Sequence, residues 1–367
     1  MSEIIKGGKN FDGCDFVIRL DSDRKNTKIK LLQITDMQII DSLQRRTPDR
    51  LRIDEINSWK PENFEALCGN QIRSLVVQTK PDLIFITGDI IYGSFDDSGT
   101  TLEWFCGLMD SLEIPWAPVF GNHDNESVKG VKWQCEQFEK SKYCVFARGN
   151  VSGNSNYTVG IAVDDELVRV LHLLDSNGCT NCDHADVIKA EGIYLDQIEW
   201  IKENTSRITE IHKKKIPAFA AFHIPTEEFV TAEEAKGYRT ADRNFYTIGI
   251  DVPAAGDDFG CKLEKYSGIR VEGGFLGILK ECNIDGVFAG HCHKINTCID
   301  YEGIKWVFGL KTGQYDYHTI GQNGGTLITL EGDAFEVQHI SALVPYAPFP
   351  GNAPIFKDFF AEDKFIQ

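Results

Sequence analysis

Five short polar motifs follow apolar stretches of the sequence, and their side chains are of the kinds that bind metal ions. In chain order they are Asp36 in "ITDMQ", Gly88-Asp89, Gly121-Asn122-His123-Asp124, His223 in "FHIP", and Gly290-His291-Cys292-His293. Carboxylate, amide and imidazole groups supply the oxygen and nitrogen atoms that hold divalent and trivalent cations in proteins. Each motif alone has an ordinary explanation, because an aspartate after a strand often caps a turn or a helix. The five together, in this order, predict a site for two metal ions.

The apolar stretches before these motifs predict the strands that would bring the motifs together. They lie at 29–35, 82–89, 116–122, 217–225 and 284–293. Amphipathic patterns between them predict helices, for example over 64–75 and 105–112. Such alternation is typical of an α/β protein with a buried sheet. Because ligands of these sheets bind at the carboxyl ends of the strands, we expect the five motifs to meet at one edge.

The order and spacing of the motifs resemble those of the calcineurin-like metallophosphoesterases, over residues 36–293. Within that family the chain is similar to the purple acid phosphatase branch in its short single-domain form. The similar segments are "GDIIYG", "VFGNHDNES", "FHIP" and "GFLGILKECNIDGVFAGHCH". The resemblance implies a four-layer α/β/β/α sandwich with a dinuclear metal site at the carboxyl-terminal edge of the strands.

The resemblance also implies a role for each motif residue. The implied ligands of the first metal ion are Asp36, Asp89, Tyr92 and His293, with Asp89 bridging. The implied ligands of the second are Asn122, His223 and His291. His123 would face the leaving group. The position of Asp124 next to it, independently of the resemblance, predicts that Asp124 either orients His123 or caps the helix that follows. The two ions would be iron, manganese or zinc.

Gln38 departs from the family pattern. Many members have a histidine two residues after the first aspartate, and the purple branch has a glycine there and lets a tyrosine complete the shell. A glutamine oxygen binds hard metal ions less strongly than a carboxylate or an imidazole does. Two alternatives follow. Either Tyr92 is a ligand and Gln38 orients another ligand or a bound water, or Tyr92 is a buried aromatic residue. In the second case the first metal site is weak and fills only at high metal concentration, with Gln38 as the substitute ligand.

The expected reaction is hydrolysis of a phosphomonoester in a phosphorylated small molecule or protein. Two metal ions about 3.5 to 4 Å apart would generate hydroxide near neutral pH and clamp the phosphoryl oxygens. Protonated His123 would stabilise the developing charge and protonate the leaving oxygen. Candidate substrate contacts are Arg45, Arg239, Arg243 and Tyr246. Two alternatives are hydrolysis of a phosphodiester or nucleotide at the same site, and a catalytically weak binding scaffold, which Gln38 favours.

The composition of the chain excludes some classes of partner and predicts how the chain is organised. The 367 residues carry a formal net charge of −17, which argues against binding to nucleic acid or to anionic membranes through bulk charge. No apolar run approaches the ~18 residues of a membrane span, and the start lacks a signal-peptide pattern. We expect a cytoplasmic protein with one domain over 1–367, a possible lid at 225–280 and a tail at 343–367.

The sequence has one C-x-x-C pair, Cys179 and Cys182. These two residues could form a loop disulfide, half a metal site, or two free thiols.

Overall fold

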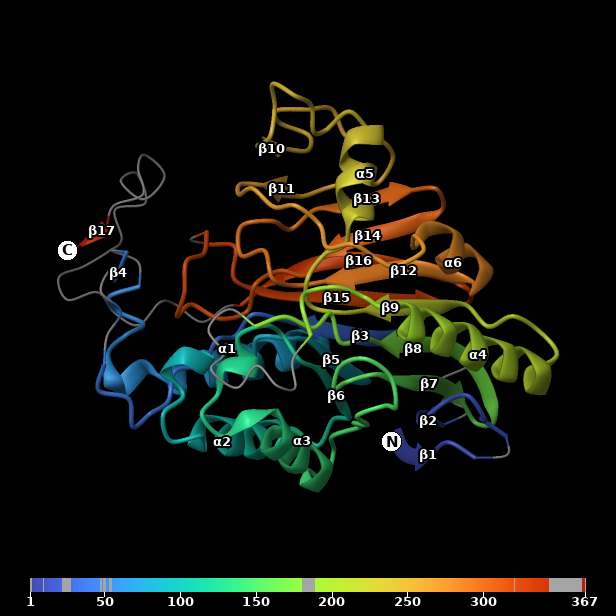
Figure 1. Cartoon of the computed structure of the whole chain (residues 1–367), viewed down its shortest axis with the longest axis horizontal. Coiled ribbons are helices and arrows are strands. Elements are labelled where there is room, and N and C mark those ends of the chain that lie inside the picture. The colour runs from blue at the N-terminus through green and yellow to red at the C-terminus, as the bar shows by residue number, and fades with distance from the viewer. Residues whose placement is uncertain are drawn as a thin grey trace.

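The computed structural model describes residues 2–8, 10–21, 28–46, 48, 51–52, 55–179, 189–319, 321–342 and 365–366. Two β-sheets lie face to face, and helices cover the outer face of each (Figure 1). This four-layer arrangement of helices, sheet, sheet and helices confirms the fold that the sequence predicts. Within the described residues, no helix is long and apolar enough to cross a membrane.

The first sheet has five strands in the order β16-β15-β3-β5-β6. Their bounds are β3 (Ile29–Ile34), β5 (Leu83–Thr87), β6 (Trp116–Val119), β15 (Gly324–Glu331) and β16 (Ala334–Ser341). Strands β3, β5 and β6 are parallel, and β15 runs antiparallel to β3. Every residue of β5, "LIFIT", is buried, which is typical of a parallel strand covered on both faces.

Three helices cover the outer face of this sheet: α1 (Ala66–Thr79), α2 (Thr100–Asp110) and α3 (Gly130–Lys140). In α1 the buried residues recur every three or four positions, so that one side of the helix faces the sheet. The helix ends at Thr79 and is capped by Lys80, which has a left-handed backbone and precedes a proline. The helices predicted over 64–75 and 105–112 correspond to α1 and α2, whereas the sequence pattern did not predict α3.

The second sheet has eight strands in the order β1-β2-β7-β8-β9-β12-β14-β13. Their bounds are β1 (Ser2–Lys6), β2 (Phe16–Leu20), β7 (Tyr157–Val163), β8 (Glu166–Leu173), β9 (Ala218–Ala221), β12 (Ile284–Ala289), β13 (Cys298–Tyr301) and β14 (Ile304–Phe308). Its outer face packs against α4 (Leu195–His212), α5 (Glu227–Ala235) and α6 (Leu276–Glu281). Strands β8, β9 and β12 are parallel to one another.

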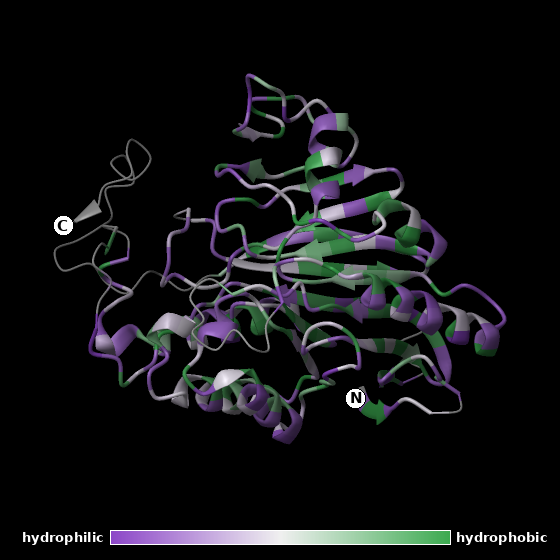
Figure 2. Cartoon of the chain, viewed as in Figure 1, coloured by the Kyte–Doolittle hydropathy of each residue, from purple (hydrophilic) through white to green (hydrophobic). Residues whose placement is uncertain are grey.

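Aromatic side chains from both sheets fill the space between them. The ring of Phe85 in β5 lies 5.5 Å from that of Phe288 in β12, and Phe219 in β9 lies 5.1 Å from Phe288. Figure 2 shows the result as apolar strands at the centre and polar helix surfaces outside. This packing holds the two sheets in one relative position, so that loops from both can form a single site.

The first candidate ligand of each predicted motif lies two or three residues after the end of a strand. Asp36 follows β3, Asp89 follows β5, and Asn122 follows β6 in the first sheet, whereas His223 follows β9 and His291 follows β12 in the second. Because β3, β5 and β6 are parallel, as are β9 and β12, each set of motifs lies at one edge of its sheet.

The remaining elements are short. They are the 3₁₀ helices η2 (Pro61–Asn63), η3 (Gly93–Phe95) and η4 (Asp124–Glu126), and the strand pairs β10 (Tyr246–Thr247) with β11 (Cys261–Lys262) and β4 (Leu51–Arg52) with β17 (Phe365–Ile366). The segment 225–280, predicted as a possible lid, contains α5, β10, β11 and all of α6 except its last residue. The single domain and the lid stay predictions. Most of the predicted tail, residues 343–364 and 367, lies outside the described residues.

Candidate metal centre

Three of the predicted ligands form a compact buried cluster. Asp36, Asp89 and His223 each offer one ligand atom, and these atoms all lie within 4.8 Å of one another. Asn122 joins the cluster, because its Oδ1 lies 3.1 Å from Nε2 of His223 and 3.0 Å from Nδ1 of His291. The structure therefore brings together side chains that follow β3, β5, β6, β9 and β12.

The sixth predicted ligand, His293, lies on the side of Asp36. Its Nε2 is 3.4 Å from Oδ1 of Asp36, and its Nδ1 donates to the carbonyl oxygen of Tyr317 at 3.0 Å. Asp36 also accepts hydrogen bonds at Oδ2 from the hydroxyl of Thr35 at 2.7 Å and from the backbone nitrogen of His291 at 3.0 Å. Burial disfavours ionised Asp36, but the bond to His293 and the nearby His223 outweigh burial and lower its pKa to about 2.

The backbone at three of these ligands adopts the left-handed conformation that non-glycine residues rarely adopt. The φ angles are 52° at Asp36, 52° at Asp89 and 69° at His291. Such conformations cost roughly 1–3 kcal/mol each and persist where the surrounding structure or function requires them. Their concentration at one cluster is what we expect of a functional site.

At two motif positions only glycine fits, because a neighbouring side chain lies close to the backbone. A Cβ atom at Gly121 would lie 2.1 Å from Oδ1 of Asp89, and one at Gly290 would lie 2.1 Å from Oγ1 of Thr35. Real Cβ atoms do not approach other heavy atoms this closely. The glycines in Gly-Asn-His-Asp and Gly-His-Cys-His thus make room for the carboxylates of the cluster.

The hydrogen bonds of His223 leave electron-rich atoms facing one another at the centre of the cluster. Its Nδ1 lies 2.7 Å from the carbonyl oxygen of Thr87 and therefore carries the proton of the neutral ring. Its Nε2 then presents a lone pair to Oδ2 of Asp89 at 3.2 Å and to Oδ1 of Asn122 at 3.1 Å. Within the described residues, Oδ2 of Asp89 is buried and accepts no hydrogen bond.

A cation shared by these three atoms would remove their mutual repulsion. Without a cation, the positive charge that removes this repulsion must come from a second proton on the ring of His223. Burial opposes that proton, but Asp89 outweighs burial and raises the pKa of His223 to about 9. Mixed carboxylate, amide and imidazole donors suit iron, manganese or zinc. The residues present therefore fit a metal site.

His123 lies beside the cluster with one ring nitrogen paired to a buried acid. Its Nδ1 lies 2.8 Å from Oε2 of Glu126, whose side chain is fully buried and also accepts a hydrogen bond from the backbone nitrogen of Ser94 at 3.1 Å. The ring of His123 is 20% exposed, so it stands at the mouth of the site. Burial lowers its pKa, but Asp89 and Glu126 outweigh burial and raise the pKa to about 9. Sequence reasoning missed Glu126.

Asp124 occupies a different place from the one expected as an orienting partner of His123. Its carboxylate accepts four backbone N–H groups, from Asp89, Ile90 and Gly121 at 2.8 Å each and from Ile91 at 3.1 Å. Glu126, rather than Asp124, contacts the ring. In the structure Asp124 ties the loop after β5 to the loop after β6.

The two alternative ligands of the first metal position also have defined surroundings. Oε1 of Gln38 accepts a hydrogen bond from Nζ of Lys311 at 2.7 Å. The ring of Tyr92 stands edge-on to that of His123, with centroids 5.5 Å apart, and also packs against Trp59 and Phe95. Sequence reasoning gave no signal for Lys311. Coordination of a metal ion by Tyr92 or Gln38 stays a prediction.

Comparison with known proteins agrees with the geometry. Residues 29–294 match the model of the family described as calcineurin-like phosphoesterases. The chain belongs to this family. The match confirms the family that the motifs indicated, and it covers every motif that contributes to the cluster.

Individual relatives of this calcineurin-like phosphoesterase share less than a third of its residues over the matched regions. "Probable inactive purple acid phosphatase 29" of Arabidopsis thaliana is 24% identical over 323 residues, which cover 82% of this chain and 75% of the relative. "Phosphatase DCR2" of Saccharomyces cerevisiae is 29% identical over 294 residues, 75% of this chain but only 45% of the relative. Among solved structures, the purple acid phosphatase PPD1 of yellow lupin seeds matches with a TM-score of 0.43 and 12% identity, over 86% of this chain and 52% of that one.

Of the four candidate substrate contacts, the three arginines contact residues close to them in the sequence, and the tyrosine is buried. Arg45 donates to the carbonyl oxygen of Gln44 at 2.9 Å. Arg239 lies 3.7 Å from a carboxylate oxygen of Glu234. Arg243 donates to the backbone of residues 237 and 238, and Tyr246 is buried. Contact of any of them with substrate stays a prediction.

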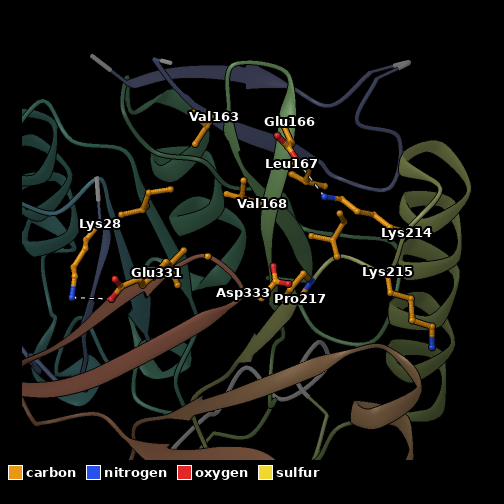
Figure 3. Close-up of a pocket in the computed structure, with 14 residues that line it drawn as sticks. Lys28, Val163, Glu166, Leu167, Val168, Lys214, Lys215, Pro217, Glu331 and Asp333 are labelled. Carbon is orange, nitrogen blue, oxygen red and sulfur yellow. Dashed lines mark hydrogen bonds and ion pairs between the residues drawn. The ribbon is translucent and has the colours of Figure 1, made fainter. Parts of the chain in front are cut away.

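A cavity of about 590 Å³ lies at the other end of the sandwich (Figure 3). It is lined by residues at the start of β3 and of β9, including Ile29 and Pro217, whereas the metal cluster follows the opposite ends of the same strands. Among its charged side chains, Lys28 pairs with Glu331 at 3.0 Å. This cavity is therefore separate from the candidate metal centre.

Of the two cysteines in the C-x-x-C pair, Cys179 is disulfide-bonded, whereas Cys182 lies outside the described residues.

Proposed function

We propose that this chain is a dinuclear metallophosphoesterase that hydrolyses phosphomonoesters. The observation that carries the proposal is the arrangement of His223, Asp89 and Asn122, whose electron-rich atoms face one another in a buried site and fit a cation. His123, paired to the buried carboxylate of Glu126 at the mouth of that site, supports catalysis in addition to metal binding.

The residues of the site would have two roles, metal binding and proton donation. Asp36 and His293 would hold one metal ion, Asn122, His223 and His291 the other, and Asp89 would bridge the two. When bound, two such ions lower the pKa of a water molecule and neutralise the charge of a phosphoryl group. His123, with Nδ1 engaged by Glu126, has Nε2 free to give a proton to the leaving oxygen. The proton comes from the imidazolium that Asp89 and Glu126 stabilise.

A binding scaffold without catalysis is the second candidate, and the name of one relative, "Probable inactive purple acid phosphatase 29", favours it. Binding alone requires neither an imidazole at the mouth of the site nor a buried acid paired to it. Burying the Glu126 carboxylate is costly unless it is paired, and its pairing with His123 is of use to a catalyst. We therefore place catalysis first.

The test is the His123→Ala variant, prepared with manganese, iron or zinc and assayed on p-nitrophenyl phosphate. We expect the wild-type protein to hydrolyse this monoester and the variant to lose about 10²- to 10⁴-fold in kcat, the usual contribution of a positioned proton donor. Metal content should stay unchanged. The matched control is His212→Ala at the end of α4, which should retain full activity. A fully metal-loaded wild-type protein without turnover on monoesters or diesters would establish the scaffold instead.

A further inference from the structure

Lys311 and Gln38 form a buried pair beside the metal cluster. Nζ of Lys311 donates to the backbone carbonyl of Asp36 at 2.8 Å and to Oε1 of Gln38 at 2.7 Å. The exposed fractions of the two residues are 1% and 0%. A lysine nitrogen in this position can only donate, so the oxygen of the Gln38 amide must be the atom that faces it. Lys311 thereby sets the orientation of the whole amide group.

The other end of that amide is a donor without an acceptor. Nε2 of Gln38 is buried and makes no hydrogen bond within the described residues. Leaving a buried N–H group unsatisfied costs roughly 1–3 kcal/mol, and native proteins rarely do so without a reason. Gln38 also has a left-handed backbone, with φ of 46°. Strain and an unsatisfied donor thus occur together at one residue of the site.

The position of Gln38 indicates what the donor is for. It lies two residues after Asp36, and its backbone nitrogen donates to the carbonyl oxygen of Asp89 at 2.9 Å, so it joins the loops that carry two candidate ligands. An amide nitrogen does not ligate cations, because its lone pair is delocalised into the carbonyl group. It is well suited to donate to the oxygen of an anion.

We propose that Gln38 binds a phosphoryl oxygen of the substrate through Nε2 and is not a metal ligand, and that Lys311 is the residue that positions it. Lys311 donates to Oε1, the side-chain atom with which Gln38 would coordinate a metal ion, and an ammonium group at this atom disfavours a cation there. The inference rests on the proposed function, since it requires that phosphate binds at the metal centre.

The experiment compares Gln38→Met with the wild-type full-length chain, both loaded with manganese. Methionine keeps the length of the side chain and removes both the donor and the acceptor. The metal content of each protein is measured by elemental analysis, and the Kd for inorganic phosphate by calorimetry. We expect the number of bound metal ions to stay the same and the Kd to rise about tenfold or more, as for the loss of a hydrogen bond to a charged group. Gln71→Met, at a buried glutamine of α1, is the matched control and should change neither quantity.

A second variant tests the part of Lys311. In Lys311→Met the Gln38 amide is free to turn, so the Kd for phosphate should also rise, and adding Gln38→Met to it should weaken phosphate binding little further. Fewer bound metal ions in Gln38→Met would show that Gln38 is a ligand and overturn the inference. An unchanged Kd for phosphate would overturn it as well, while hydrolysis by the wild-type protein would leave the proposed function standing. A wild-type protein that binds no metal or no phosphate would overturn both.

Discussion

At the scale of single residues, the pairing of His123 with Glu126 is the feature that favours the proposed catalytic role over metal binding alone. The buried Glu126 carboxylate holds Nδ1 of the ring at 2.8 Å, which fixes the tautomer and directs Nε2 outward. In the proposed mechanism Glu126 therefore acts through His123. Its contribution should depend on how much the leaving group needs a proton.

The Glu126→Gln variant tests that dependence. We expect kcat to fall about tenfold to a hundredfold on an alkyl phosphate, whose alkoxide leaves only when protonated, and by a much smaller factor on p-nitrophenyl phosphate. Metal content should not change. A loss that is equal for the two substrates would show that Glu126 has only a structural role. Glu103→Gln, at an exposed position in α2, is the control.

Residue types and order in the sequence were enough to predict which candidate ligands lie together, but the residues that support them were not accessible in this way. Asp36, Asp89, Asn122, His223 and His291 could be found because each follows a strand in a recognisable motif. Lys311 is 273 positions from Gln38 and stands in no motif, so that only the fold reveals their contact. Glu126 had a local signal, an acid three residues after His123, but Asp124 offered a competing one.

At the scale of elements, the loops that follow β5 and β6 depend on one carboxylate. Asp124 accepts four backbone N–H groups from these loops, and two of them come from Asp89 and Gly121, which shape the cluster. The sequence suggested an N-cap or an orienting residue. Both are local functions, whereas the observed contacts reach 35 positions back along the chain to Asp89.

Replacing Asp124 by Asn should therefore loosen both loops. The amide group can present only one acceptor oxygen, so at least some of the four N–H groups lose their partner. We expect the free energy of unfolding to fall by about 3 kcal/mol, at 1–3 kcal/mol for each unsatisfied group, as measured by urea denaturation. Asp165→Asn, in the exposed turn after β7, should stay within about 0.5 kcal/mol of the wild-type protein. Equal unfolding midpoints for Asp124→Asn and the wild-type protein would contradict this role of Asp124.

At the scale of the whole molecule, the candidate metal centre forms where two sheets meet at one edge. The first sheet supplies Asp36, Asp89 and Asn122, and the second supplies His223 and His291. The aromatic core between Phe85 and Phe288 sets the distance between them. The motifs predicted this architecture through their resemblance to a family. Apolar periodicity alone predicted an α/β protein with a buried sheet, because it does not reveal how strands are shared between two sheets.

The most direct measurement is the metal content per chain of the wild-type protein and of Asp89→Asn, after incubation with manganese, iron or zinc. Asp89 lies in the three-residue cluster and is the predicted bridge between the two metal ions. We expect two metal ions per chain in the wild-type protein and at most one in the variant. A wild-type protein that binds one metal ion or none, or a variant that still binds two, would contradict the dinuclear centre.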